Sequence, residues 1–209
     1  MSDFTLKRGL SEVYAAEIIT DTAEKFETGE PFHLIPAGEM TRNTSTESTP
    51  QYFDNVVFYQ SGAEGVTEIS ITGAALRPAA LARLNGKYVD ETTGAVLDTG
   101  EYTEKYFAVG GKAGNTDKTA EYFWMLKGTF TIPELTDKTE DDTTDTNGMT
   151  LTYNAIQTQH KFNVGGEMKP MKRVVIDTQT SELVEDASWT AQVVTPENLA
   201  TVAKKKTTT

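Results

Sequence analysis

The sequence predicts a mainly β protein, a β-sandwich or barrel-like fold in which one short α-helix packs on a sheet. Threonine makes up about one residue in six, well above its average use, and its β-branched side chain favours strands. Several segments alternate between apolar and polar residues, which is the period of a half-buried strand. The 209 residues suffice to bury a full core, and without cysteine the chain has neither disulfides nor thiolate metal sites.

The first third is expected to combine short strands with a long polar loop. Ser11–Thr20 is typical of a strand, although its Ala and Glu residues leave a helix open, and Phe32–Ile35 follows the turn at Glu27–Pro31 as a second strand. Ala37–Gln51 is rich in Thr and Ser, and its only bulky aliphatic residue is a methionine, so it is predicted to be a loop. Tyr52–Tyr59 is then a strand, followed by a turn at 61–65.

One amphipathic helix is predicted after the alternating strand Val66–Gly73. Pro78 suits the first turn of a helix, and Gly86 is placed to end it in a left-handed conformation. The apolar residues of this region recur at helical spacing, namely Leu76, Ala80, Leu81 and Leu84.

The segment that follows the helix is expected to form a hairpin, a strand and a loop. Lys87–Val89 and Val96–Leu97 flank a Thr-Gly turn, which indicates the hairpin. Lys105–Val109 is typical of a strand, and Gly110–Lys118 of a flexible loop.

The most informative segment is Glu121–Gln159, which predicts a strand, an acidic loop and a second strand. Gly128 indicates a bulge or a close backbone approach, and Pro133 ends the first strand because proline has no N–H to donate. The loop at 131–150 carries six acidic residues and one lysine, a formal net charge of −5, and Thr150–Thr158 alternates again. Alternation in the first strand places one apolar set on a single face, namely Tyr122, Trp124, Leu126, Phe130 and Ile132.

The C-terminal part is expected to be a separate β-containing extension, residues 166–209, after a domain of residues 1–165. Val164–Lys169 reads as a linker, and Lys204–Lys206 as a frayed, flexible basic tail. Arg173–Asp177 and Trp189–Val194 are predicted to be strands, and residues 196–203 a short terminal helix.

The charge and the residue types argue against several functions. A net charge of −12, from 31 acidic and 19 basic residues, is the wrong sign for gripping nucleic acid. No secretory signal and no membrane span are expected. The two histidines, His33 and His160, have no metal-binding spacing, and no nucleophile elbow or phosphate loop is present. We therefore expect no catalytic site, no cofactor and no metal, and the chain is not expected to be an enzyme.

The aromatic strand W-M-L-K-G-T-F-T-I-P, the acidic run K-T-E-D-D and the Thr-rich strand after it resemble the major tail protein of long-tailed bacteriophages, the subunit of the tail tube. The resemblance extends upstream through VTEISITGAALRPAALARLNG and the G-K-Y-V-D-E-T-T-G hairpin, and covers roughly residues 10–165. The segment after Gly166 lies outside it.

The resemblance implies a structural virion protein that assembles in the host cytoplasm and resides in the virion tail. Six copies would form a ring, rings would stack into a tube, and viral DNA would pass through the lumen without specific binding. The tape measure protein and other tail proteins would be further partners. An acidic or neutral lumen would let DNA slide, because a basic one would hold its phosphates.

Two polar segments are candidates for contacts between copies. The loop 37–51 resembles in position the extended loop with which the family joins stacked rings. Arg42, Asn43 and Glu47 would be its polar contacts and Phe53 the anchor of its base. The acidic loop, with Glu140, Asp141, Asp142 and Asp145, is the second candidate. The alternative function is a carbohydrate-binding β-sandwich module, which should display exposed aromatic residues in a row.

Overall fold

The computed structural model describes residues 4–53, 56–101, 103–134, 148–185 and 188–206, and within 47–63 it describes the backbone alone. The mainly β prediction is confirmed, because most of these residues lie in strands and the helices among them are few and short. The strands are β1 (Lys7–Asp21), β2 (Phe26–Thr28), β3 (Phe32–His33), β4 (Ala37–Phe53), β5 (Val56–Ala74), β6 (Tyr88–Val89), β7 (Val96–Leu97), β8 (Phe107–Asn115), β9 (Ala120–Phe130), β10 (Gly148–Ile156), β11 (Lys161–Val164), β12 (Glu167–Pro170), β13 (Arg173–Asp177), β14 (Ser181–Leu183) and β15 (Ala203–Lys205). The helices are α1 (Pro78–Leu84), α2 (Ser188–Ala191) and α3 (Leu199–Val202).

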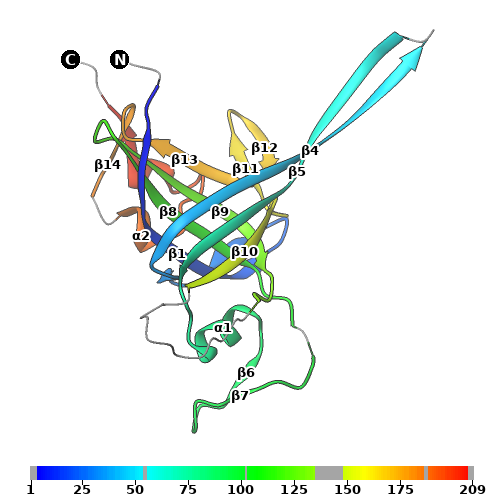
Figure 1. Cartoon of the computed structure of the whole chain (residues 1–209). Helices are drawn as coiled ribbons and strands as arrows, with labels where there is room; N and C mark the ends of the chain where they lie inside the picture. Colours follow the sequence, from blue (N-terminus) through cyan, green and yellow to red (C-terminus); the bar gives the residue numbers. More distant parts are fainter. Residues whose placement is uncertain (1–3, 54–55, 102, 135–147, 186–187, 207–209) are drawn as a thin grey trace, which may run out of the picture.

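The main sheet is antiparallel and is built around β9 (Figure 1). Its order is β2-β1-β8-β9-β10-β5-β4, with β3 attached to β1 and β13 attached to β9. β8 lies along one edge of β9, whereas two strands share the other edge. β13 pairs with Glu121–Met125, and β10 pairs with Lys127–Phe130. The sheet therefore branches at β9.

Gly128 marks this branch point. Between the pairs Val109–Met125 and Phe107–Gly128, β9 has one residue more than β8, which is a bulge. A Cβ on Gly128 would lie 2.5 Å from a ring carbon of Tyr153, so a side chain does not fit. The predicted bulge and the predicted close backbone approach are both confirmed.

The bulge also exchanges the faces of β9. Trp124, before the bulge, and Leu126, at its start, belong to one cluster of buried residues, whereas Phe130, after the bulge, belongs to another. The prediction that Phe130 shares a face with Trp124 is therefore wrong, because one extra residue reverses the alternation. Ile132 follows the end of the strand and is 59% exposed.

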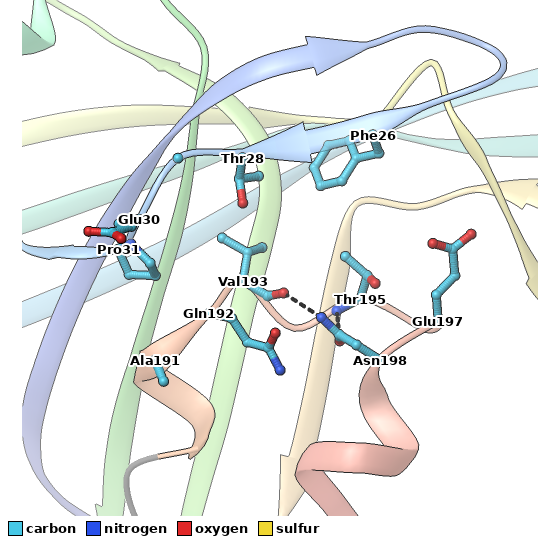
Figure 2. Close-up of a pocket in the computed structure, with 11 residues that line it drawn as sticks. Phe26, Thr28, Glu30, Pro31, Ala191, Gln192, Val193, Thr195, Glu197 and Asn198 are labelled. Atoms are coloured by element: carbon cyan, nitrogen blue, oxygen red, sulfur yellow. Dashed lines mark hydrogen bonds between the residues drawn. The ribbon is translucent and has the colours of Figure 1, made fainter.

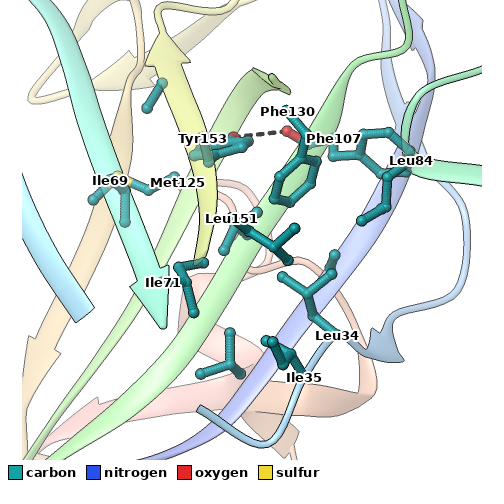
Figure 3. Packing of buried hydrophobic residues seen from close by; sticks show 14 of the residues in the cluster. Leu34, Ile35, Ile69, Ile71, Leu84, Phe107, Met125, Phe130, Leu151 and Tyr153 are labelled. Carbon is teal, nitrogen blue, oxygen red and sulfur yellow. Dashed lines mark hydrogen bonds between the residues drawn. The ribbon is translucent and has the colours of Figure 1, made fainter. Parts of the chain in front are cut away.

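The first core is enclosed by β1, β5, β8, β9 and β10 (Figure 3). Tyr153 is fully buried in it, and its hydroxyl donates a hydrogen bond of 2.8 Å to the carbonyl oxygen of Phe107. Burial raises the pKa of Tyr153 well above its ordinary value. Other large side chains of this core are Leu34, Ile35, Ile69, Ile71, Met125, Phe130 and Leu151.

Helix α1 packs against this core and is confirmed at both ends. Pro78 occupies its first turn, and Gly86, just after the helix, has a φ of +66°. Leu84 is buried in the core, and Leu81 packs against it. Ala82 is buried and Ala80 is exposed, so the apolar stripe differs from the predicted one at this position.

The second core covers the opposite face of β1, β8 and β9. Trp189 on α2 is fully buried, and its Nε1 donates to the carbonyl oxygen of Phe123 at 3.3 Å. Nε1 of Trp124 in turn donates to the carbonyl oxygen of Trp189 at 2.9 Å. The expected domain boundary at 165/166 falls in the β11–β12 turn. Buried residues from both sides of that turn belong to this core, namely Phe162, Val174, Ile176, Val193, Val194 and Val202.

The prediction that Ala37–Gln51 is a loop is wrong. It lies in β4, which pairs with β5 from Ala37–Gly73 to Phe53–Val56. The predicted strand Tyr52–Tyr59 is accordingly divided between β4 and β5, and the predicted turn at 61–65 lies inside β5. The outer half of this hairpin pairs with no other described strand. The sequence of this half lacks the apolar–polar alternation that marks a half-buried strand, which is why it resembles a loop.

Three further predictions of irregular structure, a loop, a linker and a frayed tail, are wrong. β8 continues through Gly110 and Gly111 to Asn115 because these glycines make room for aromatic rings, Phe123 lying 3.1 Å from a Cβ built on Gly111. The predicted linker 164–169 is the β11–β12 hairpin, whose turn residues Gly165 and Gly166 both have positive φ. The predicted frayed tail 204–206 is held to the body, since β15 pairs with β14 and the Lys206 N–H donates to the carbonyl oxygen of Thr180.

Near the C-terminus, the predicted strand Trp189–Val194 is also wrong. Helix α2 covers Ser188–Ala191 instead, and it directs the Trp189 ring into the second core. The apolar run VV after it resembles a strand but has no strand partner among the described residues. The short terminal helix is confirmed as α3.

Candidate functional site

A two-stranded ribbon projects from the body of the molecule (Figure 1). We use "the ribbon" for residues 46–53 of β4 and 56–64 of β5. These residues pair with one another along both strands. The pairing between β10 and β5 ends at Thr67, before the ribbon begins. Eight residues of strand correspond to about 25 Å. Both outer edges of the ribbon lack a described partner, so its backbone groups there are open to pairing.

The root of the ribbon is a bulge in β5. Thr44 lies opposite Thr67, and Thr46 lies opposite Glu64, so β5 has one residue more than β4 between these pairs. The hydroxyls of Thr44 and Thr67 are 3.0 Å apart and hydrogen-bonded. Ser45 Oγ donates to the carbonyl oxygen of Val66 at 3.2 Å. Bulges bend and twist a strand, so this one sets the direction in which the ribbon leaves the sheet.

Lys172, just before β13, holds the same root from the side. Its Nζ donates to the carbonyl oxygen of Gly65 at 2.7 Å, to Glu64 Oε2 at 3.3 Å and to Thr67 Oγ1 at 3.4 Å. The Lys172 side chain is only 10% exposed. Its ammonium thus satisfies a backbone carbonyl that the bulge leaves without a strand partner. No pattern in the sequence indicates this contact, because the two segments lie more than a hundred residues apart.

Arg42 anchors β4 to the body two residues before the root. Its Nη1 lies 2.8 Å from Glu121 Oε1, and its guanidinium lies 3.8 Å from the centre of the Phe123 ring. Lys7 Nζ reaches the other carboxylate oxygen of Glu121 at 2.5 Å. Burial alone would raise the pKa of Glu121, but the hydrogen bonds from Lys7 and Arg42 lower it below its ordinary value. Arg42 is therefore engaged within its own chain.

The structure separates the other predicted contact residues along β4. Asn43 is exposed next to the root and lines a hollow of about 270 Å³ with Glu68 and Asn154. Glu47 lies opposite Ala63 in the ribbon. The prediction that Phe53 anchors the base is wrong, because Phe53 is the last residue of β4, at the far end of the ribbon. Glu140, Asp141, Asp142 and Asp145 lie outside the described residues.

A buried ion pair joins β9 to the end of β1, and two backbone N–H groups from the segment after β10 add to it. Lys127 Nζ lies 2.7 Å from Asp21 Oδ2, and the two side chains are 7% and 3% exposed. The N–H groups of Gln159 and His160 also donate to the Asp21 carboxylate. Burial would raise the pKa of Asp21, but the Gln159 N–H, the Lys127 ammonium and the His160 N–H together lower it. The ammonium also lies 4.6 Å from the centre of the Tyr106 ring.

The two histidines occupy separate places. His33 is exposed beside Tyr14, with ring centres 5.5 Å apart. His160 is buried against Phe162, and its Nε2 lies 3.5 Å from Glu197 Oε1. Among the described residues, no group of three or more histidine, cysteine or acidic side chains could hold a metal ion.

An open groove of about 450 Å³ runs between β2 and the extended segment 192–195 (Figure 2). Phe26, Pro31 and Val193 form its apolar lining. The Asn198 side chain fixes the far wall, since it accepts a 2.8 Å hydrogen bond from the Thr195 N–H and donates one of 3.0 Å to the Val193 carbonyl oxygen. Acidic side chains lie toward opposite ends of the groove, Glu30 at one and Glu197 at the other.

Comparisons with known proteins do not assign the chain to a family. In the part of the chain that the structure describes, no helix is long and apolar enough to cross a membrane. The structure itself offers the ribbon, its root and the faces of the sheet as the candidate site. No protein-family model matches the chain, and a search of curated proteins finds no match either.

Proposed function

We propose that the chain is the tube subunit of a long-tailed bacteriophage. Copies form hexameric rings, the rings stack into a tail tube, and DNA passes through the lumen during ejection. The tape measure protein and other tail proteins are its further partners, and its place is the virion tail. The single observation that carries the proposal is the ribbon, which leaves the body with both outer strand edges unpaired among the described residues.

A projecting two-stranded ribbon would be more stable if another chain paired with it. An isolated two-stranded hairpin is marginally stable in water, and unpaired strand edges pair readily with other chains. The residues that fix its root, Thr44, Thr67, Lys172 and Arg42, hold it at a defined angle. A fixed angle is useful if every copy must meet its neighbour in the same way. Contact with a second copy in a neighbouring ring would cover the edges and stabilise the ribbon.

One face of β4, β5 and β10 has the character of a lumen surface. Directly paired residues share a face, and three rows across these strands are polar. Among these residues two are acidic and none is basic. DNA phosphates would find no cation to hold them there. The rows are Glu39–Thr72–Thr150, Thr41–Ser70–Thr152 and Asn43–Glu68–Asn154.

The size of such a wall is also suitable. The branch β9-β10-β5-β4 offers four adjacent strands. Six copies would give 24 strands, and at about 4.8 Å per strand these enclose a circumference of about 115 Å before tilt. The corresponding backbone diameter is about 37 Å, wide enough for a DNA duplex after inward side chains are added.

Negative-stain electron microscopy of the concentrated protein tests the proposal. Rings with six-fold symmetry, or long hollow tubes, are expected. The matched variant replaces residues 46–64 by Asn-Gly, a two-residue turn that can join Ser45 to Gly65. This ribbonless variant should stay folded by circular dichroism and form no tubes.

Tubes formed equally well without the ribbon would contradict its proposed role. Uniform monomers of the intact protein, even when mixed with a tail initiator complex, would contradict the tube proposal as a whole. Among the residues whose side chains the structure describes, the large exposed aromatic residues Phe4 and Tyr88 lie on different parts of the chain and form no row of the kind that the carbohydrate-binding alternative would need. If the intact protein stayed monomeric under these conditions, a glycan screen would be the next experiment.

A further inference from the structure

The residues before β1 display two apolar side chains on an ordered backbone. Phe4 is 89% exposed and Leu6 is 73% exposed. Yet the backbone is held, because the Thr116 N–H donates to the Leu6 carbonyl oxygen at 2.9 Å, and the Thr5 side chain hydrogen-bonds to Asp117 in the same β8–β9 turn. We call residues 4–6 the knob. Large apolar side chains that stand exposed on a backbone held in place indicate a contact surface.

Positive charge follows the knob directly. Lys7 and Arg8 are the next two residues, and both are exposed. Lys7 is already paired with Glu121. Arg8, by contrast, has no ion pair with the described residues. The surface is therefore an apolar pair flanked by an available guanidinium.

The groove between β2 and the segment 192–195 has the complementary character (Figure 2). Its apolar floor is made by Phe26, Pro31 and Val193. Glu30 and Glu197 supply negative charge toward its two ends, and no lysine or arginine is among the described residues that line it. Its volume of about 450 Å³ lies in the range of pockets that hold a small-molecule ligand, about 300–1,000 Å³, so it has room for large side chains.

The knob and the groove lie at opposite ends of β1. The knob precedes Lys7, whereas β2 pairs with Ile18–Asp21, at the far end of the strand. The separation along β1 is about 30 Å or more, so the knob does not reach the groove of its own chain. Two different surfaces at opposite ends of one strand give a head-to-tail contact, which continues from copy to copy instead of closing as a symmetric dimer.

We propose that the knob of one copy seats in the groove of a second copy, with Phe4 and Leu6 against the apolar floor and Arg8 against Glu30 or Glu197. The inference rests on the proposed assembly into a stacked tube and adds a contact that is separate from the ribbon. It also fixes the polarity of the stack, since each copy offers its knob at one end and its groove at the other.

Disulfide trapping tests the contact directly, because the chain has no cysteine of its own. Leu6→Cys and Gln192→Cys are prepared as separate proteins, mixed, assembled and oxidised. Gln192 is exposed at the groove. A disulfide needs Cα atoms within about 7 Å, so a cross-linked dimer reports contact between copies. The control pair is Tyr88→Cys with Gln192→Cys, since Tyr88 is exposed on β6 and lies outside the knob. We expect the first pair to cross-link and the control pair not to.

Assembly measurements give the second readout. The double variant Phe4→Ser with Leu6→Ser should raise the protein concentration at which assembly begins by about tenfold or more, because two large apolar side chains would no longer be buried. Tyr88→Ser removes an exposed aromatic ring elsewhere and should leave that concentration unchanged. Arg8→Glu should also raise it, and combining Arg8→Glu with Glu30→Lys and Glu197→Lys should lower it again.

The outcomes separate this contact from the tube proposal. Tubes that form at the wild-type concentration with the Phe4→Ser, Leu6→Ser variant, and that give no Leu6–Gln192 cross-link, would overturn the knob contact while the tube proposal stands. A cross-link in head-to-tail chains that never form rings or tubes would support the contact and overturn the tube. Cross-linking by the control pair as efficient as by the test pair would count against a specific contact.

Discussion

The ammonium of Lys172 lies 2.7 Å from the carbonyl oxygen of Gly65, at the point where the ribbon leaves the sheet. The two residues come from segments that are far apart in the chain, and the Lys172 side chain is 10% exposed. The C-terminal segment therefore takes part in setting the direction of a hairpin built from the first third of the sequence. The root of the ribbon is the joint through which the body controls its candidate contact surface.

Removing the Lys172 ammonium should loosen the ribbon. Lys172→Met keeps most of the side-chain volume but leaves the Gly65 carbonyl and the Thr67 hydroxyl without this donor. Loss of a charged donor costs about 1.5–3 kcal/mol, and we expect faster amide exchange at the root and weaker tube formation. Hydrogen exchange by mass spectrometry checks this, with the exposed Lys169→Met as control. Unchanged exchange at residues 64–67 would refute it.

The buried pair between Asp21 and Lys127 should contribute strongly to the free energy of unfolding. Lys127→Met would leave the Asp21 carboxylate buried without its cation, and such a loss costs about 3–5 kcal/mol. Urea unfolding at pH 7 measures this. Exposed Lys25→Met, whose partner Glu27 is also exposed, should change stability by less than about 1 kcal/mol.

The sign of the pH effect follows from the lowered pKa of Asp21. Its stabilising contribution is present above the unfolded value of 3.8 and is lost as the pH falls through the lower folded value. The stability difference between the wild type and Asp21→Asn should therefore be largest near neutral pH and shrink below pH 3.8. Urea unfolding from pH 7 to pH 2 tests this, and a difference that grows toward acid would contradict it.

A methyl group at the branch point should not be tolerated. Gly128→Ala would place Cβ 2.5 Å from the ring of the fully buried Tyr153 and 2.4 Å from the backbone carbonyl oxygen of Asn154. Overpacking of this kind costs about 1–3 kcal/mol or more. Gly29→Ala is the matched control, because its Cβ would meet nothing closer than 3.7 Å. Thermal unfolding should show a clear loss for the first variant and little change for the second.

Lys118 offers a stabilising change. It lies in the β8–β9 turn with a φ of +68°, in the left-handed region that favours glycine. Lys118→Gly should raise the free energy of unfolding by up to about 1 kcal/mol, because the backbone strain of a residue with a Cβ is relieved. Chemical denaturation measures it. A loss of stability would mean that the Lys118 side chain makes a contribution larger than the strain.

The polar face of β5 and β10 should determine whether DNA slides or sticks. Ser70 and Thr152 lie directly opposite one another on this face. Changing both to lysine should make assembled tubes retain duplex DNA, with retention falling as salt rises. Wild-type tubes should not retain it. Lysines at Thr99 and Glu101, which are exposed after β7, provide the control; equal retention by both variants would argue against this face as the lumen.

Features with local causes can be predicted from the amino-acid sequence alone. The Thr-rich composition and the alternation in β10 predicted a mainly β protein, and Pro78 and Gly86 predicted both ends of α1. Gly128 was found for the same reason, since a glycine inside an aromatic strand indicates a close approach. The proposed contact residues were only partly placed: Arg42 and Asn43 lie at the root of the ribbon, but Phe53 lies at its far end.

Features that depend on a partner segment appear only when the chain has folded. The bulge at Gly128 moves Phe130 to the other face because β8 has one residue fewer there, a count that β9 alone does not contain. Ala37–Gln51 is a strand because β5 pairs with it, although its outer half lacks the alternation of a half-buried strand. Lys172 is a root residue only because folding brings it to Gly65. Hydrophobic periodicity records which side chains are buried, whereas backbone pairing and side-chain-to-carbonyl contacts leave no periodic trace in the sequence.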